Sequence, residues 1–206
     1  MTKILWLTFS PRGENSESYK LSAKIVELLL QKHAGATVFN HAFGDGSIAH
    51  VDENYAISQG SAADVSKDGS MARSEELVKE LEIADIIVIG TPMHNLSVPS
   101  TLKAWIDHIV RARRTFNITA AGKVGTLRDR PVYIAIASGG RFSGEKARQP
   151  DFLTPYLRAV LGIAGLHDLR FFSVQGTGAG PDVTAETRRH THGELEEHFA
   201  PISAVG

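Results

Sequence analysis

The chain of 206 residues contains no cysteine. Disulfide bonds, cysteine-ligated zinc and catalysis by a thiolate are therefore excluded. The chain also has no excess of charge of one sign, because it contains 22 basic and 23 acidic side chains. Proteins that bind nucleic acid usually carry a basic surface, so this balance gives no support to a nucleic-acid partner.

Long hydrophobic runs and several well-known motifs are also missing. No stretch approaches the roughly 20 apolar residues of a membrane-spanning helix. The N-terminal segment MTKILWLTFS is typical of a first strand rather than of a signal peptide. The chain has no GxxxxGK[ST], GxGxxG or HExxH motif and no nucleophile elbow, which disfavours nucleoside triphosphates, a standard dinucleotide fold and hydrolytic chemistry. We therefore expect a soluble cytoplasmic protein without a membrane partner.

What is present is an alternation of short apolar runs with helical patterns. The runs that predict strands cover residues 3–8, 36–42, 86–90, 132–137 and 169–174. Segments such as IIVIG and VYIAIA are apolar almost throughout, as expected for strands that are covered on both faces. Between the strands, apolar residues recur every three or four positions, for example at Leu102, Trp105 and Ile109. We predict an α/β fold, namely a flavodoxin-like doubly wound sheet of five parallel strands in the order 2-1-3-4-5 with helices on both faces.

The length and an apolar content of 42% predict a single domain over residues 1–206. Two segments do not fit the alternation. Residues 44–70 are polar and rich in glycine, serine and aspartate, so we expect a surface excursion that leads into a helix near residues 72–82. Residues 115–127, TFNITAAGKVGTL, carry β-branched residues on both sides of Ala-Gly and predict a small inserted hairpin.

Three loops rich in serine, glycine or asparagine follow predicted strands, at residues 10–18, 91–97 and 137–140. Open α/β sheets bind their ligands beyond the carboxyl ends of the strands. In the first loop, Ser16 and Ser18 lie at a predicted helix N-terminus, which favours an anion. Glu17 would have to turn its carboxylate away from a bound anion, and its backbone N–H could then donate a hydrogen bond to that anion. Taken alone, this loop is better explained by Asn15 or Ser16 capping the helix.

The second and third loops favour a flat ligand. Backbone groups around residues 93–96 and 138–140 would flank a planar ring, and Gly139 and Gly140 would allow a close backbone approach. Taken alone, Gly139-Gly140 would be an ordinary turn. Three such loops at the ends of neighbouring strands favour a phosphorylated ligand with a planar ring.

Two longer segments carry a family resemblance. PMHNLSVPSTLKAWIDHIVRARRTFNITAAGKVGTL resembles the core of the FMN-dependent NADH:quinone oxidoreductases, also called FMN-dependent azoreductases. DFLTPYLRAVLGIAGLHDLRFF is similar to a later helix and the fifth strand of that family. The resemblance implies a homodimeric, flavodoxin-like flavoenzyme that holds one FMN per subunit near the dimer interface. It also implies NADH or NADPH as the electron donor and a quinone or an azo compound as the acceptor.

The resemblance further implies which residues bind the cofactor. The FMN phosphate would contact Ser10, Ser16, Glu17 and Ser18, and the ribityl chain and ring would contact Met93, His94, Asn95, Leu96, Ala137, Ser138, Gly139 and Gly140. Phe116 on the hairpin would line the partner subunit's site, or would belong to a local core. No metal site is expected, because His190, His192 and His198 are better explained as a solvated helix face.

The chain departs from the family at two places. His94 and Leu96 replace the family's usual tyrosine and phenylalanine, and the tail from Gln175 onward differs from the usual family ending. His94 is the one candidate catalytic residue: it either hydrogen-bonds a flavin carbonyl or a quinone oxygen, or is merely exposed. No acid–base pair is needed for hydride transfer, because the flavin supplies that chemistry.

We therefore expect two-electron, ping-pong hydride transfer from NADH or NADPH through bound FMN to the acceptor. Two alternatives remain open at this point. One is a flavodoxin-like electron carrier, although the near-neutral charge gives no sign of the acidic docking face that such carriers typically have. The other is an NAD(P)H-dependent FMN reductase that releases reduced flavin.

Overall fold

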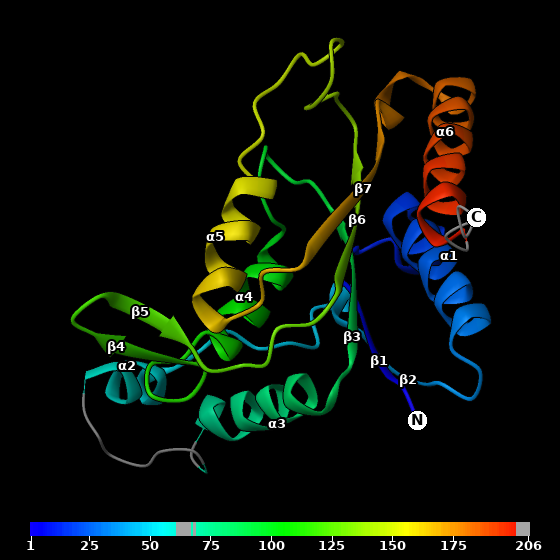
Figure 1. The fold of residues 1–206 in the computed structure, drawn as a ribbon. Helices are drawn as coiled ribbons and strands as arrows, with labels where there is room; N and C mark the ends of the chain where they lie inside the picture. Colours follow the sequence, from blue (N-terminus) through cyan, green and yellow to red (C-terminus); the bar gives the residue numbers. More distant parts are fainter. Residues whose placement is uncertain (61–66, 68, 201–206) are drawn as a thin grey trace.

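The protein contains one five-stranded parallel sheet and one separate hairpin (Figure 1). The computed structural model describes residues 1–60, 67 and 69–200. The parallel strands are, in spatial order, β2 (Thr37–Ala42), β1 (Lys3–Thr8), β3 (Ile86–Pro92), β6 (Val132–Ser138) and β7 (Leu169–Gln175). Numbered without the hairpin, this order is 2-1-3-4-5, so the predicted fold class is confirmed.

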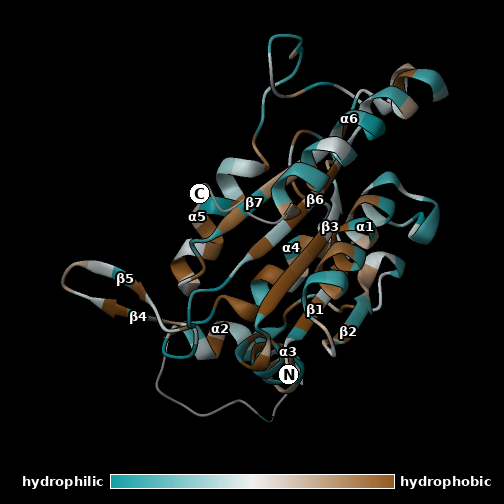
Figure 2. Ribbon diagram, turned by 45° about the vertical axis from the view of Figure 1, so that its right-hand side comes forward, coloured by the Kyte–Doolittle hydropathy of each residue, from teal (hydrophilic) through white to brown (hydrophobic). Residues whose placement is uncertain are grey.

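Two layers of helices enclose the sheet (Figure 1). One face carries α1 (Glu17–Lys32) and α6 (Pro181–Phe199), and the other carries α3 (Gly69–Ile83), α4 (Ser100–Ile109) and α5 (Thr154–Ala164). Hydrophobic residues gather on the central strands between these layers (Figure 2). Every residue of β3 from Ile86 to Thr91 is buried, which explains why its sequence is apolar almost throughout.

The predicted hairpin is present as β4 (Phe116–Thr119) and β5 (Gly122–Gly125), which pair antiparallel. It is anchored to the end of α5, because Leu127 N–H donates to the Ala164 carbonyl over 3.1 Å. A side chain at Gly125 would collide with the backbone of Gly165, so the close contact at this point requires glycine.

The polar excursion after β2 contains more structure than the sequence predicts. A short helix, α2 (Glu53–Gly60), precedes α3, and α3 begins at Gly69, three residues before the predicted start. Only eight residues form α2, and a single one of them, Ser58, is buried, so no apolar periodicity marks it. Residues 61–66 and 68 of the excursion lie outside the described residues.

Glycine at one position of β3 fixes the height of α1 above the sheet. A Cβ atom added at Gly90 would lie 2.6 Å from Ser22 Oγ and 2.9 Å from the Ser18 carbonyl oxygen. Helix α1 can therefore pack this closely only because position 90 has no side chain. The contact brings the first turn of α1 next to the carboxyl ends of β1 and β3. Among the described residues, no helix combines the length and apolar character needed to cross a membrane.

Trp105 on α4 is central to the packing on the face opposite α1. Its side chain is 1% exposed, and its ring centroid lies 6.0 Å from that of Phe9, at the start of the first ligand-facing loop. Replacing Trp105 with alanine should lower the free energy of unfolding by about 3–5 kcal/mol, because it leaves a cavity in the core. Urea unfolding of the purified protein measures this change.

Leu30→Ala is the matched control, because Leu30 is 41% exposed on the outer side of α1. Its cost should stay below about 1 kcal/mol. Equal costs for the two substitutions would contradict the assignment of Trp105 to the core.

Candidate functional site

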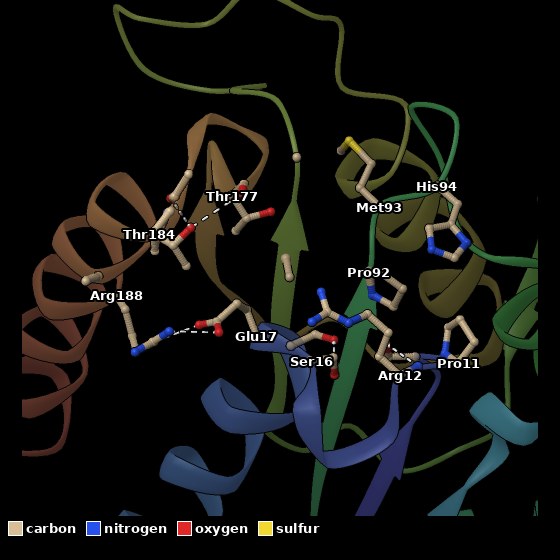
Figure 3. Close-up of a pocket in the computed structure, with 17 residues that line it drawn as sticks. Pro11, Arg12, Ser16, Glu17, Pro92, Met93, His94, Thr177, Thr184 and Arg188 are labelled. Carbon is tan, nitrogen blue, oxygen red and sulfur yellow. Dashed lines mark hydrogen bonds and ion pairs between the residues drawn. The ribbon is translucent and has the colours of Figure 1, made fainter.

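A pocket of about 740 Å³ opens at the carboxyl edge of the sheet (Figure 3). It is formed by the loop after β1, the first turn of α1, the ends of β3 and β6, and the segment that leads into α6. Its lining residues are Ser10, Pro11, Arg12, Ser16, Glu17, Ser18, Pro92, Met93, His94, Ala137, Gly139, Thr177, Gly180, Pro181, Thr184, Ala185 and Arg188. The volume lies within the range of small-molecule sites.

The N-terminus of α1 forms one end of this pocket. Ser16 is the N-cap, and its Oγ accepts a hydrogen bond from Tyr19 N–H over 3.2 Å and donates to the Gly13 carbonyl over 2.8 Å. Ser18 Oγ lies 3.4 Å from Ser16 Oγ. Because the N–H groups of a helix's first turn have no acceptor within the helix, this end of the pocket favours an anion. Capping by Ser16 and anion binding are therefore compatible, since the cap takes up only the N–H of Tyr19 among those of the first turn.

Glu17 follows the cap, and its carboxylate points toward α6 (Figure 3). Arg188 binds it through two hydrogen bonds, from Nε to Oε2 over 2.7 Å and from Nη2 to Oε1 over 2.8 Å. Lys20 Nζ lies 3.1 Å from Oε1. Partial burial acts to raise the pKa of Glu17, but the hydrogen bonds and positive charges of Arg188 and Lys20 outweigh it and hold the pKa below its usual value. Glu17 is therefore ionised at neutral pH.

The loop after β3 forms a tight turn at the opposite side of the pocket. Backbone N–H groups of His94 and Ser97 each donate to the other residue's carbonyl over 3.0 Å. The two residues between them, Asn95 and Leu96, have φ angles of 48° and 70°. Positive φ at both central residues is the geometry of a type I′ turn, which asparagine tolerates and leucine rarely adopts. This turn sets the direction in which Met93 and His94 leave the strand.

The structure brings eight of the twelve predicted site residues to the pocket lining: Ser10, Ser16, Glu17, Ser18, Met93, His94, Ala137 and Gly139. The other four, Asn95, Leu96, Ser138 and Gly140, lie in the same loops but not on the lining. Asn95 and Leu96 form the turn described above. Gly140 lies beneath the side chain of Gln149, and Ser138 Oγ accepts a hydrogen bond from Gln149 Nε2 over 3.2 Å.

Gln149 connects two of the predicted loops and was not predicted from the sequence. Besides Ser138, its Nε2 lies 3.2 Å from the sulfur of Met93. The side chain thus bridges the ends of β3 and β6 next to the pocket. No local motif marks a glutamine in the polar segment between β6 and α5, so only the folded chain reveals this contact.

Sequence reasoning also missed the contribution of the C-terminal segment. Gly176 and Gly180 have φ angles of 77° and 114° and flank a single turn of 3-10 helix, Thr177–Ala179. Helix α6 then begins at Pro181 and directs its first turns at the pocket (Figure 3). Proline after glycine is a helix-start signal, and the sequence predicts a polar helix after Pro181, but not that this helix lines the pocket.

The C-terminal histidines lie along α6, outside the pocket lining. His190 pairs with Glu194, and His198 Nε2 lies 3.1 Å from Arg170 Nη1. Burial and the nearby positive charges of Arg170 and Lys32 lower the pKa of His198. Over the described ranges 1–60, 67 and 69–200, no group of three side chains is arranged to hold a metal ion.

Comparisons with known proteins agree with the resemblance. Residues 2–199 match a family model described as the flavodoxin-like fold. "FMN-dependent NADH:quinone oxidoreductase 2" of Cupriavidus pinatubonensis is 43% identical over 188 residues, which cover 90% of this chain and 91% of that protein. "FMN-dependent NADH:quinone oxidoreductase 4" of Pseudomonas fluorescens is 40% identical over 188 residues, with coverage of 91% and 90%.

Solved structures show the same fold. The crystal structure of an azoreductase from Bacillus anthracis aligns with a TM-score of 0.81 at 24% identity, over 97% of this chain and 99% of that one. At this identity the likeness concerns the fold alone. The family model and the two relatives, however, each span most of the chain, so the chain belongs to the flavodoxin-like family that includes the FMN-dependent NADH:quinone oxidoreductases.

Proposed function

We propose that this protein is an FMN-dependent oxidoreductase that uses NADH to reduce quinones or azo compounds. The observation that carries the proposal is one pocket that joins a serine-capped helix N-terminus to the loops after β3 and β6. Relatives that are about 40% identical over nine-tenths of the chain bear the name FMN-dependent NADH:quinone oxidoreductase. Bound FMN would accept a hydride from the nicotinamide and later deliver it to the acceptor.

The residues present fit the two ends of FMN. Ser16, Ser18 and the first-turn N–H groups of α1 would hold the phosphate, with Ser10 and Arg12 beside them. Near Gly139, no atom lies within 4 Å of the position of an added Cβ, so this backbone is open to a flat ring. The side chains of Asn95 and Leu96 are not on the pocket lining. Their turn would instead support the ring from the β3 side by fixing the backbone of Met93 and His94.

His94 is placed to meet the acceptor rather than the phosphate. Its side chain is exposed at the pocket, across from α6 (Figure 3). We propose that the imidazole hydrogen-bonds an oxygen of the acceptor, because an imidazole can donate or accept near neutral pH. We include NADPH in this proposal as an alternative electron donor. We also propose that the protein is located in the cytoplasm.

We also propose that the protein is a homodimer in which the hairpin contacts the second subunit. Ile118 and Val124 are 69% and 50% exposed, and Phe152 near the pocket is exposed as well. The hairpin projects from the body of the molecule beside α2 (Figure 1), and an isolated two-stranded hairpin with an apolar surface gains stability by packing. Phe116 is 4% exposed in its own subunit, so its contact with a partner's site stays a prediction.

The phosphate site is tested with Ser18→Ala, because Ser18 Oγ is not the helix cap. Loss of a hydrogen bond to a phosphate should cost about 1–2 kcal/mol, so the Kd for FMN should rise about five- to thirtyfold. Quenching of flavin fluorescence measures Kd. Riboflavin, which lacks the phosphate, is the control and should bind both proteins alike. An unchanged Kd for FMN would place the phosphate elsewhere.

The reaction is tested by steady-state kinetics with NADH and a quinone at several fixed concentrations. Because both substrates would use one pocket in turn, double-reciprocal plots should give parallel lines. Intersecting lines would mean that both substrates bind together. NADH oxidation that releases free reduced FMN would favour the flavin reductase, and no NADH oxidation with any acceptor would favour the electron carrier.

The oligomeric state is tested by light scattering coupled to gel filtration. The wild-type protein should have twice the 22.3 kDa mass of one chain. The double variant Ile118→Asp/Val124→Asp should shift to the monomer, because charges would then face an apolar interface. Leu30→Asp, at an exposed position on the outer side of α1, is the control variant and should leave the mass unchanged. A monomeric wild-type protein at micromolar concentration would contradict the proposal.

A further inference from the structure

Helices α1 and α6 are joined at the pocket by one ion pair. Arg188 lies on α6 and Glu17 on the first turn of α1, 171 residues apart in the sequence, and two hydrogen bonds of 2.7 and 2.8 Å connect them. Both residues line the pocket beside Ser16 and Ser18 (Figure 3). The pair therefore stands at the end of the pocket to which we assign the phosphate.

A carboxylate at this place opposes the proposed ligand. Glu17 lies between Ser16 and Ser18 in sequence, and it is ionised because its pKa lies below the usual value. An unpaired negative charge would repel a phosphate, and the repulsion would be strong because the site is partly shielded from water. Something must offset this charge if the N-terminus of α1 is to bind an anion.

We propose that Arg188 is a positioning residue that makes the phosphate site usable by neutralising Glu17 and holding its carboxylate against α6. This inference rests on the proposed function. Arg188 acts through Glu17 rather than by binding the phosphate itself. Two of its three guanidinium nitrogens, Nε and Nη2, are already engaged side-on by the two carboxylate oxygens.

The position of Arg188 is fixed by contacts farther along α6. Thr191 Oγ1 donates to the Ser173 carbonyl of β7 over 2.8 Å, which ties the helix to the sheet. Thr184, four residues before Arg188, also lines the pocket, because side chains at this spacing share one face of a helix. Lys20 contacts the same carboxylate, but through a single nitrogen, at 3.1 Å, and with a more exposed side chain.

The experiment compares the wild-type protein with Arg188→Gln, Glu17→Gln and the double variant, each titrated with FMN and with riboflavin. Arg188→Gln should raise the Kd for FMN about tenfold through the unopposed charge of Glu17. It should leave the Kd for riboflavin nearly unchanged. Glu17→Gln should not weaken FMN binding, and adding it to Arg188→Gln should restore the affinity of the Glu17→Gln protein.

Arg189→Gln is the matched control, because Arg189 is the next residue of α6, is exposed, and carries the same charge outside the pocket lining. It should change neither Kd. Melting curves followed by circular dichroism show that each variant is folded before titration.

Three results would overturn the inference. An FMN Kd unchanged in Arg188→Gln would show that Glu17 needs no counter-ion. Equal losses for FMN and riboflavin would show that Arg188 only supports the structure of the pocket. A double variant as weak as Arg188→Gln would show that Arg188 binds the phosphate directly. Failure of the proposed function is distinct, because the wild-type protein would then not bind FMN at all.

Discussion

The site depends on how closely α1 can approach the sheet at Gly90. An added Cβ at this position would lie 2.6 Å from Ser22 Oγ, so any side chain would push the helix outward. With glycine, the capped first turn of α1 lies level with the ends of β1 and β3, and Ser16 and Ser18 share a pocket with Met93. A packing contact within a strand thus determines whether the two ends of the pocket, to which we assign the phosphate and the ring, belong to one site.

The charge at this edge of the sheet depends on α6 as well as on α1. Helix α1 directs its N-terminus at the pocket, while α6 lines it with one face of its first two turns, at Pro181, Thr184, Ala185 and Arg188. The partial positive charge at the start of α1 adds to the charges of Arg12 and Arg188. Against this stands the carboxylate of Glu17. Its ion pair with Arg188 removes the one nearby negative charge that lines the pocket and also joins the two helices across the opening. Stability and anion affinity are therefore coupled at this point of the fold.

The sequence predicted the sheet, its strand order, the hairpin and eight of the 17 residues that line the pocket, because these depend largely on local patterns. Continuous apolar runs mark β3 and β6, and serine next to a helix start marks the first turn of α1. It did not predict α2, which is too short and exposed to show periodicity. It also missed Gln149 and Arg188, whose roles arise from contacts with residues 56 and 171 positions away. Contacts of this kind leave no trace in local spacing.

The turn after β3 is a rigid part of the pocket wall. Leu96 at a φ of 70° costs roughly 1–3 kcal/mol of backbone strain. The reciprocal hydrogen bonds between His94 and Ser97, and the one from Phe152 N–H to the Leu96 carbonyl over 3.2 Å, hold it there. The backbone that presents His94 is consequently fixed before a substrate arrives. The exposed imidazole of His94 lines the pocket beside this turn, whereas Gln149 lies outside the lining and is held by its hydrogen bond to Ser138.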